Sequence, residues 1–283
     1  MDTQELNTIP VALIGAGGKM GHRIARNLRK QGRPALHVEI GEAGRAALLA
    51  EQFEIVPLEQ ALDGTRIVIM CVADSAIQRV AKSMSPLLAA GTMLVALDAA
   101  VPYIGGLPDR PDLTYFIGHP CHTPMFNDEH EPAAKLDFSA GTHAKQHIVC
   151  TLMQGPESDY AVGEAICRQI FAPVMRAHRV TVDQMAVLEP VLSETVGGSC
   201  LAIIREAMDE AIARGVPREA ARDFILGHLY SMSSVIFEER KGAFSAAANL
   251  AIASGKRALF RDDWKRVFEP EAIHESIQEL LTK

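Results

Sequence analysis

Short apolar runs alternate with longer amphipathic stretches over the first 180 residues of the chain. The apolar runs are rich in valine, isoleucine and leucine and predict β-strands, whereas the longer stretches repeat with a helical period. The predicted strands cover residues 10–14, 35–40, 66–72, 92–97, 113–117, 146–151 and 174–181. The clearest helices between them cover residues 20–31, 77–88 and 158–171. Strands and helices that alternate in this way predict a parallel sheet covered by helices.

The strand pattern ends at Thr181, and the remaining chain has only helical periodicity. Thr181 with Gln184 three positions later forms a capping-box pattern, which marks the start of a helix. The apolar spacing then continues to Arg214, and Gly215 follows, a residue type that commonly ends helices. We therefore predict a Rossmann-type doubly wound parallel sheet over residues 1–180 and an all-helical C-terminal domain over residues 181–283.

Composition and charge favour a globular protein that binds a small molecule. The 283 residues are 48% hydrophobic and 22% charged, and the net charge of −7 argues against a nucleic acid or an anionic membrane as partner. The N-terminus lacks the pattern of a signal peptide, and no apolar run approaches the roughly 20 residues that span a bilayer. The five cysteines form no CxxC pair, so we expect no disulfide framework. These features predict a cytoplasmic location.

The stretch VALIGAGGKMG places glycines directly after the first predicted strand and at the start of a helix. Glycine permits the tight turn and lets a pyrophosphate approach the free N–H groups of the helix. The spacing is GxxGxxG rather than the usual GxGxxG. We expect this turn to bind a dinucleotide through Gly15, Gly17, Gly18, Lys19, Met20 and Gly21.

Two further strand ends belong to the predicted cofactor site. Glu39, near the end of the second strand, is placed to bind the adenosine ribose hydroxyls. Because its carboxylate would repel a 2′-phosphate, we expect NAD rather than NADP, although Arg45 lies nearby in the sequence. The third strand ends in Val72, Ala73 and Asp74, at the edge where such sheets bind ligands. Asp74 is equally well explained as a helix N-cap.

A sheet of this kind followed by a long helix and a smaller helical domain resembles the 6-phosphogluconate dehydrogenase-like superfamily. The stretches GAGGKMG, CVADSAI and GVPREAARDFILGHL carry the resemblance. In hydroxyacid dehydrogenases of this superfamily, the long helix supplies a lysine general base and an asparagine lies nearby. This chain has no lysine between Lys145 and Lys241 and no asparagine between Asn127 and Asn249. The resemblance therefore implies a different mechanism.

The long helix instead carries two glutamates, in LEPVLSETVGG. This stretch resembles ketol-acid reductoisomerase, whose long helices contribute carboxylates to divalent metal ions beside the nicotinamide. That family spaces the two acids by four residues, whereas Glu189 and Glu194 are five apart, about 140° around an α-helix. Pro190 could interrupt the helix and change this angle. Alternatively, Glu189 caps a helix break, and Glu194 forms an ion pair or lies at a dimer rim.

Histidines supply further candidate ligands and bases. His119 and His122 follow the fifth predicted strand, whose carboxyl end faces the same edge, and an imidazole can bind metal or take up a proton near neutral pH. An ordinary turn is the alternative for this pair. His228 in LGHLY is another candidate ligand, with a core histidine as the alternative. Cys121 could in principle act as a nucleophile, but no oxyanion-binding arrangement accompanies it.

The combination of GAGGKMG, GHPCHTP, LEPVLSET and DFILGHL most resembles the D-apionate oxidoisomerase family of bacterial sugar-acid enzymes. The resemblance implies NAD-dependent oxidation of a branched hydroxy acid coupled to migration of a carbon substituent, a ketol-acid reductoisomerase reaction in the oxidative direction. It also implies a divalent cation, which could be magnesium, manganese or zinc. The implied metal ligands are His119, Glu189, Glu194 and His228, and the implied catalytic residues are His119, His122 and Glu194.

Three other functions are compatible with the sequence. A simple NAD-dependent hydroxyacid or semialdehyde dehydrogenase would use His119 or His122 as a base without metal. A biosynthetic ketol-acid reductase would prefer NADPH, which Glu39 disfavours. A non-catalytic NAD sensor would bind partners through its helical domain, although it would need no histidines at the predicted crevice.

The apolar long helix also predicts a homodimer. A helix that is apolar around most of its circumference must be covered on all sides, and the domain after Thr181 is too small to do so alone. We therefore expect two copies with intertwined helical domains.

Overall fold

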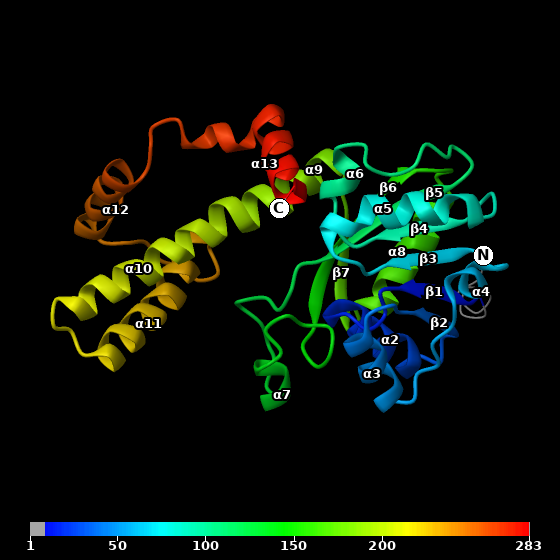
Figure 1. Ribbon diagram of the computed structural model, residues 1–283. Coiled ribbons are helices and arrows are strands. Elements are labelled where there is room, and N and C mark those ends of the chain that lie inside the picture. The colour runs from blue at the N-terminus through cyan, green and yellow to red at the C-terminus, as the bar shows by residue number, and fades with distance from the viewer. Residues whose placement is uncertain (1–8, 283) are drawn as a thin grey trace. The chain divides into compact units, whose positions relative to one another are not determined.

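Seven strands form one sheet in the N-terminal part of the protein (Figure 1). The computed structural model describes residues 9–282. The strand order is β2-β1-β3-β4-β5-β6-β7. The strands are β1 (Val11–Ile14), β2 (Ala35–Val38), β3 (Ile67–Met70), β4 (Met93–Ala96), β5 (Thr114–Pro120), β6 (Gln146–Gln154) and β7 (Val174–Arg179). Each lies where the apolar runs predicted a strand, so the predicted Rossmann-type fold is confirmed.

One strand pair departs from the predicted parallel sheet. β6 runs antiparallel to β5, whereas every other neighbouring pair is parallel. Antiparallel neighbours need no crossover helix, because the chain simply turns back at the same edge of the sheet. The connection over residues 121–145 accordingly holds only one short helix, α7 (Pro132–Lys135). It is therefore a loop at the carboxyl end of β5.

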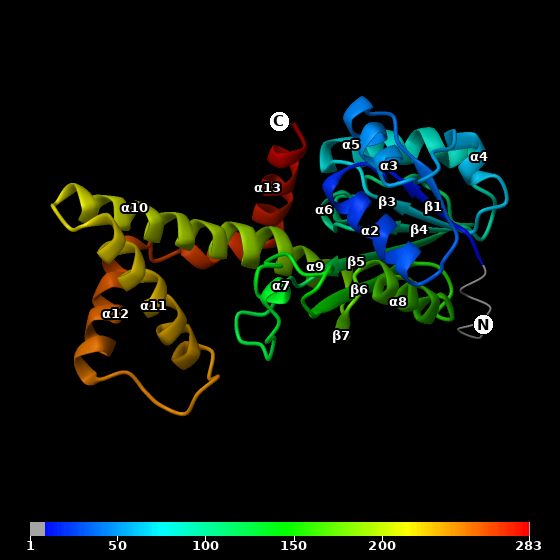
Figure 2. The same ribbon diagram turned by 90° about the horizontal axis from the view of Figure 1, so that it is seen from below.

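Helices cover both faces of the sheet (Figures 1 and 2). Neighbouring residues of a strand point to opposite faces, so Leu13 packs with α2 and α8 in one core cluster and Ala12 packs with α4 and α5 in the other. Apolar strands buried on both faces are typical of parallel sheets. Besides α7, the helices between residues 9 and 186 are α2 (Lys19–Lys30), α3 (Glu42–Ala50), α4 (Leu58–Leu62), α5 (Asp74–Met84), η1 (Ser85–Leu87), α6 (Ala100–Tyr103), α8 (Asp159–Ile170) and α9 (Val182–Ala186).

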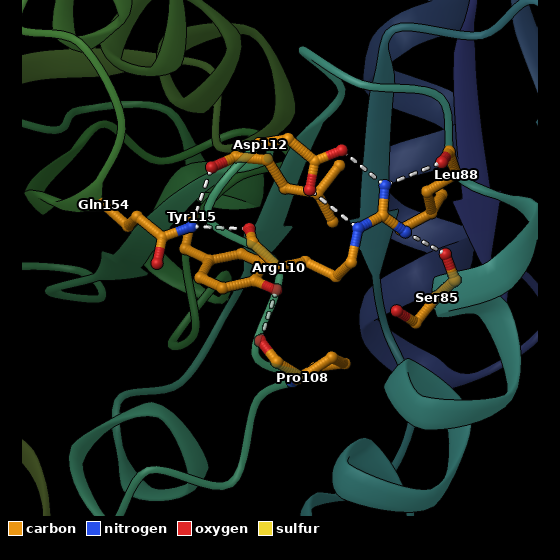
Figure 3. A network of polar contacts seen from close by, with 8 residues as sticks. Ser85, Leu88, Pro108, Arg110, Asp112, Tyr115 and Gln154 are labelled. Atoms are coloured by element: carbon orange, nitrogen blue, oxygen red, sulfur yellow. Dashed lines mark hydrogen bonds and ion pairs between the residues drawn. The ribbon is translucent and has the colours of Figure 1, made fainter.

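A polar network holds the start of β5 (Figure 3). The Arg110 guanidinium donates to the Ser85 and Leu88 carbonyls and pairs with the Asp112 carboxylate, which lowers the pKa of Asp112. Gln154, at the end of β6, donates to the Arg110 and Leu113 carbonyls at 2.9 and 2.8 Å. These contacts fix the point at which β5 enters the sheet, and hence which residues lie at its carboxyl end.

The described chain divides into two compact units. The first comprises residues 9–124, 128–186 and 276–282, and the second comprises Met125–Asn127 and Val187–Glu275. In the second unit, α10 and α11 form a helical hairpin (Figure 2). Its helices are the π-helix η2 (Val187–Gly198), α10 (Ser199–Ala213), α11 (Arg218–Ile236), α12 (Ala246–Leu259) and η3 (Trp264–Phe268), and α13 (Pro270–Thr282) follows.

The predicted long helix forms as one continuous element, Val182–Ala213. The Thr181 Oγ1 accepts from the Gln184 N–H at 3.2 Å, and the Gln184 Oε1 accepts from the Thr181 N–H at 3.0 Å. The capping box predicted from the sequence is therefore confirmed.

Among the described residues, this one helix is long and apolar enough to cross a membrane by length and composition. Its most apolar window has a mean hydropathy of 1.4, and 11% of that window is buried. The sequence-based statement that no apolar run approaches such a length was therefore wrong. That prediction considered only uninterrupted runs of apolar residues. The most apolar window of the helix reaches a mean hydropathy of 1.4 because few of its residues are charged. Helices that pack against other protein have the same composition, so the finding does not identify a membrane protein.

Gly118 on β5 offers a test of how tightly this sheet packs beside His119. A Cβ atom on Gly118 would lie 2.2 Å from the Cys167 Sγ, and Cys167 is fully buried. Overpacking of a core usually costs about 1–3 kcal/mol, so we expect Gly118→Ala to lower the free energy of unfolding by that amount in urea titrations. Cys167→Ala should restore part of this loss in the double variant, and the single Cys167→Ala variant is the control. A double variant no more stable than Gly118→Ala would contradict this packing.

Candidate active site

The glycine turn between β1 and α2 requires glycine at three positions. Gly15 has φ +79°, and a Cβ there would lie 2.7 Å from the Cys71 carbonyl oxygen. A Cβ on Gly17 would lie 2.5 Å from the Gly44 Cα, and one on Gly21 would lie 2.2 Å from the Gly15 carbonyl oxygen. A Cβ on Gly18, by contrast, would meet no atom closer than 3.5 Å. The close packing of the turn therefore rests on Gly15, Gly17 and Gly21.

The start of α2 is free of side-chain caps. Its N-cap is Gly18, the helix begins with Lys19 and Met20, and its first turn holds no acidic residue. Unpaired N–H groups at a helix N-terminus carry a partial positive charge, which suits a pyrophosphate. Lys19 and Met20 thus stand where the sequence predicted cofactor contacts.

Glu39 follows β2 and lies against the glycine turn. Its Oε2 accepts from the Gly17 N–H at 2.8 Å, and its Oε1 accepts from the Gly41 N–H at 2.7 Å. Arg45 donates to the Glu39 carbonyl at 3.0 Å, so its guanidinium is turned toward the backbone of the acid. The carboxylate of Glu39 is therefore held against the glycine turn, and its role as the ribose-binding acid stays a prediction.

The end of β3 continues into Val72, Ala73 and Asp74. The Cys71 N–H donates to the Ile14 carbonyl at 2.8 Å, which keeps this strand beside β1 as both reach the edge of the sheet. Ala73 is the N-cap of α5, and Asp74 is its first helical residue. The N-cap is therefore Ala73 rather than Asp74. The negative charge of Asp74 in the first turn complements the helix dipole.

His119 lies at the carboxyl end of β5 with one ring nitrogen already engaged. Its Nδ1 is 2.8 Å from the Leu97 carbonyl oxygen, and since a carbonyl can only accept, Nδ1 carries the proton. Burial lowers the pKa of His119, so the ring is mostly neutral near pH 7. The remaining Nε2 lone pair can therefore bind a cation or take up a proton.

Asp98 is the site residue that sequence reasoning missed. It follows β4, and one of its carboxylate oxygens lies within 4.8 Å of a ring nitrogen of His119. Its Oδ1 also accepts from the Ala100 N–H at 2.5 Å. The available signal was an acid two residues beyond a buried apolar strand, in VALDAA, the same kind of position that drew attention to Asp74.

The loop after β5 is ordered around Asp137. Burial favours a higher pKa for this acid, but three backbone N–H groups and the charge of Arg23 outweigh it and lower the pKa. The N–H groups belong to Thr142, His143 and Ala144, and they donate to Oδ2 at 2.8–3.1 Å. The Arg23 side chain, on α2, donates to the Ser139 carbonyl of the same loop. The loop is therefore tied to the helix that follows the glycine turn.

His122 is held in this loop by an uncommon backbone conformation. Its φ is +61°, its Nδ1 lies 3.0 Å from the Ser139 carbonyl oxygen, and its side chain is exposed. The rings of His119 and His122 are 6.3 Å apart and nearly perpendicular. The structure therefore brings the two predicted histidines together. Burial raises the pKa of the Cys121 thiol between them, which makes that thiol a poor nucleophile near neutral pH.

In the second unit, Glu189 and Glu194 both lie in the π-helix. Hydrogen bonds of a π-helix join residues five apart, so side chains five apart stand about one turn from each other. The 140° separation expected for an α-helix therefore does not apply. Glu189 is half-buried and Glu194 is exposed. The Thr195 hydroxyl donates to the Pro190 carbonyl, five residues earlier, at 2.7 Å.

His228 lies on α11 of the same unit. Its Nδ1 is 2.8 Å from the Phe224 carbonyl oxygen, and its ring stacks on that of Phe224 with centroids 3.9 Å apart. Both residues are exposed in the single chain. The alternative that His228 is a core histidine was therefore wrong.

Comparison with known proteins identifies the family. Residues 127–281 match the family of the C-terminal domain of phosphogluconate dehydrogenase (decarboxylating), and residues 10–99 match that of coenzyme F420-dependent NADP oxidoreductase. Proteins named D-apionate oxidoisomerase from Rhizobium rhizogenes and Cupriavidus necator are 56% and 53% identical to this chain, over 95% of it and 98% of each relative. The chain belongs to the D-apionate oxidoisomerase family. The resemblance predicted from the sequence motifs is therefore confirmed, as is the class of enzyme, an NAD-dependent oxidoreductase.

Solved structures agree with this family assignment. A semialdehyde dehydrogenase NAD-binding protein from Cupriavidus necator, in complex with calcium and NAD, is 52% identical, with a TM-score of 0.94 over 96% of this chain and 99% of that one. An NADH-preferring ketol-acid reductoisomerase from an uncultured archean has a TM-score of 0.75 over 100% of this chain and 87% of that one. At 16% identity, this second likeness shows that the D-apionate oxidoisomerase family shares the reductoisomerase fold.

The position of Glu39 leads to a test of cofactor choice. We expect Glu39→Gln to weaken NAD binding by about tenfold or more, because hydrogen bonds to a charged acceptor contribute about 1.5–3 kcal/mol. NADP binding should weaken less, since the repulsion of its 2′-phosphate is removed. Calorimetric titration with each dinucleotide measures both effects, with Glu42→Gln on the adjoining helix as the control. An unchanged ratio of the two affinities would rule out Glu39 as the discriminating group.

Proposed function

We propose that this protein oxidises D-apionate with NAD and moves a carbon substituent in the same reaction, giving 3-oxo-isoapionate. The observation that carries the proposal is the near full-length likeness to relatives named for this activity, at 56% and 53% identity. The local geometry supports it, because a histidine whose Nδ1 hydrogen is directed at the Leu97 carbonyl and a carboxylate stand together at the carboxyl edge of the nucleotide-binding sheet. We also propose that the enzyme works in the cytoplasm, on this small sugar acid.

The reaction has two parts, and each needs a proton to leave an oxygen. In the oxidation, the hydroxyl on carbon 2 loses its proton while the hydrogen on carbon 2 passes as a hydride to the nicotinamide of NAD, which leaves a carbonyl on carbon 2. In the migration, the hydroxyl on carbon 3 loses its proton and becomes the new carbonyl. A hydroxymethyl group leaves carbon 3 with its bonding electrons and joins carbon 2, whose oxygen takes up a proton. The sum is one NADH and one proton released for each substrate.

A divalent cation fits the residues at the sheet edge. His119 offers the Nε2 lone pair, and a carboxylate oxygen of Asp98 lies within 4.8 Å of the ring. Mixed nitrogen and oxygen ligands suit magnesium, manganese, calcium or zinc. When bound, such an ion supplies a positive charge that polarises neighbouring oxygens of the substrate. Glu189, Glu194 and His228 stay proposed ligands on the sequence pattern alone.

His119 and His122 then have separate tasks. Each ring has its Nδ1 directed at a backbone carbonyl, so each has only Nε2 left for chemistry. A nitrogen that binds a cation cannot take up a proton at the same time. We assign the cation to His119 and proton uptake to His122, which is exposed and whose ring is 6.3 Å away.

The test is NADH formation from D-apionate by purified protein. We expect turnover with added magnesium or manganese and none with a chelator. Carbon-13 NMR of the product should show the rearranged ketone, because oxidation without migration gives an isomer of the same mass. An unrearranged product would indicate a simple dehydrogenase. NAD binding without turnover under any cation would remove D-apionate as the substrate.

His122→Asn is the matched variant for this assay. Asparagine tolerates the left-handed backbone found at position 122, so the loop should keep its conformation. We expect turnover to fall by about 100-fold or more, as general-base removal usually does, while manganese binding stays unchanged.

We also propose that the helical unit forms a homodimer. The structure describes every residue of α10 and α12, and none of them is buried within the single chain. Several large apolar side chains on this unit are more than half exposed, among them Leu201, Phe224, Tyr230, Phe237 and Leu250. An apolar cavity of about 430 Å³ also opens between α10 and α11. Surfaces of this kind usually bind another protein surface, and a second copy is the partner that the long apolar helix predicts.

Light scattering tests the dimer. We expect a mass of twice the 30.7 kDa of the chain, and Leu201→Asp should shift the protein toward the monomer. Leu49→Asp is the control, because Leu49 on α3 of the first unit is similarly exposed, at 58% against 59% for Leu201. A monomeric wild type at low micromolar concentration would exclude the dimer.

A further inference from the structure

Asp98 stands beside His119 because of the strand register. β4 and β5 are parallel neighbours, and their last paired residues are Ala96 and Ile117. Two residues further along each strand, the same register places Asp98 opposite His119. Neighbours in a parallel register present their side chains on the same face of a sheet. The carboxylate and the imidazole therefore share one face at the carboxyl edge.

The backbone between these two residues sets the histidine tautomer. Leu97, which directly precedes Asp98, accepts the His119 Nδ1 hydrogen at 2.8 Å. The segment that carries the carboxylate thus also leaves the His119 Nε2 with its lone pair. Metal-binding histidines commonly donate their other ring nitrogen to a backbone carbonyl in this way.

The carboxylate of Asp98 is oriented as well. Its Oδ1 accepts the Ala100 N–H at 2.5 Å, which restrains rotation of the side chain. Ligand bonds of a divalent cation are about 2.0–2.6 Å long, so two ligands of one ion lie up to about 4–5 Å apart. The separation of at most 4.8 Å between the carboxylate oxygen and the ring nitrogen falls in that range.

We infer that Asp98 and His119 together bind the divalent cation of this enzyme, so that the nucleotide-binding unit supplies one oxygen and one nitrogen ligand. The inference rests on the proposed function for the presence of a cation. It adds a carboxylate that neither the sequence motifs nor the family resemblance pointed to. A purely structural role for Asp98 in the turn before α6 is the competing explanation, because its Oδ1 accepts the Ala100 N–H two residues along the chain.

Manganese binding to the full-length protein separates the two explanations without any assay of activity. Free Mn²⁺ is followed by electron paramagnetic resonance, with and without saturating NAD. We expect Asp98→Ser and Asp98→Asn each to weaken binding by about tenfold or more, comparable to the loss of a metal-site partner. Serine and asparagine can both accept the same hydrogen bond from the backbone two residues on, so the melting temperature and NAD affinity should stay close to the wild type. Asp63→Asn, an exposed acid on another helix end, is the control.

A double variant tests whether both residues hold the same ion. If they do, Asp98→Asn combined with His119→Ala should weaken Mn²⁺ binding by less than the product of the two single effects. Wild-type affinity in Asp98→Asn, or a wild type that binds no Mn²⁺ even with NAD, would overturn the inference. If Asp98→Asn loses Mn²⁺ binding but the wild type does not oxidise D-apionate, the cation site is supported and only the proposed substrate is rejected. If the wild type shows metal-dependent turnover but Asp98→Asn binds Mn²⁺ as tightly as the wild type, the proposed function is supported and Asp98 is rejected as a ligand.

Discussion

The parallel register of β1, β3, β4 and β5 is the constraint on which the site depends. The last paired residues of these strands are Ile14, Met70, Ala96 and Ile117, which form one continuous row across the sheet. Two residues beyond this row come the glycine turn, Val72, Asp98 and His119. A shift of one strand by a single residue would turn its side chains to the opposite face. In this register His119 directs its Nδ1 hydrogen at the Leu97 carbonyl, and that contact places the lone pair of the ring on Nε2.

Local patterns in the sequence were enough to predict the strands, the glycine turn and the capping box, because each depends on residues close together in the chain. Asp98 could not be found in that way. Its importance comes from a histidine on the neighbouring strand, 21 residues later, and only the pairing of β4 with β5 makes them neighbours. The antiparallel β6 was missed for a similar reason, since the residues of a strand do not record the direction of its neighbour.

The π-helix shows the limit of an assumed helical period. The apolar pattern of the long helix correctly predicted a continuous element, but the angle between Glu189 and Glu194 depends on which carbonyl each N–H reaches. Pro190 has no N–H to donate, and the Thr195 hydroxyl bonds to its carbonyl from five residues away. A spacing of five therefore does in a π-helix what a spacing of four does in an α-helix. The five-residue spacing of Glu189 and Glu194 therefore no longer argues against a shared role for the two acids, although ketol-acid reductoisomerase has a spacing of four.

The proposed migration would require more than a lysine general base on the long helix. A simple hydroxyacid oxidation removes one proton from one oxygen, and a single general base can do that. Migration also requires the neighbouring tertiary hydroxyl to become a carbonyl while the first carbonyl becomes an alkoxide, so charge develops on two adjacent oxygens. A divalent cation bound at this edge would supply positive charge that stabilises such a change better than a base aimed at one oxygen. An edge that carries a carboxylate, an imidazole with a fixed tautomer and a second histidine is suited to that task.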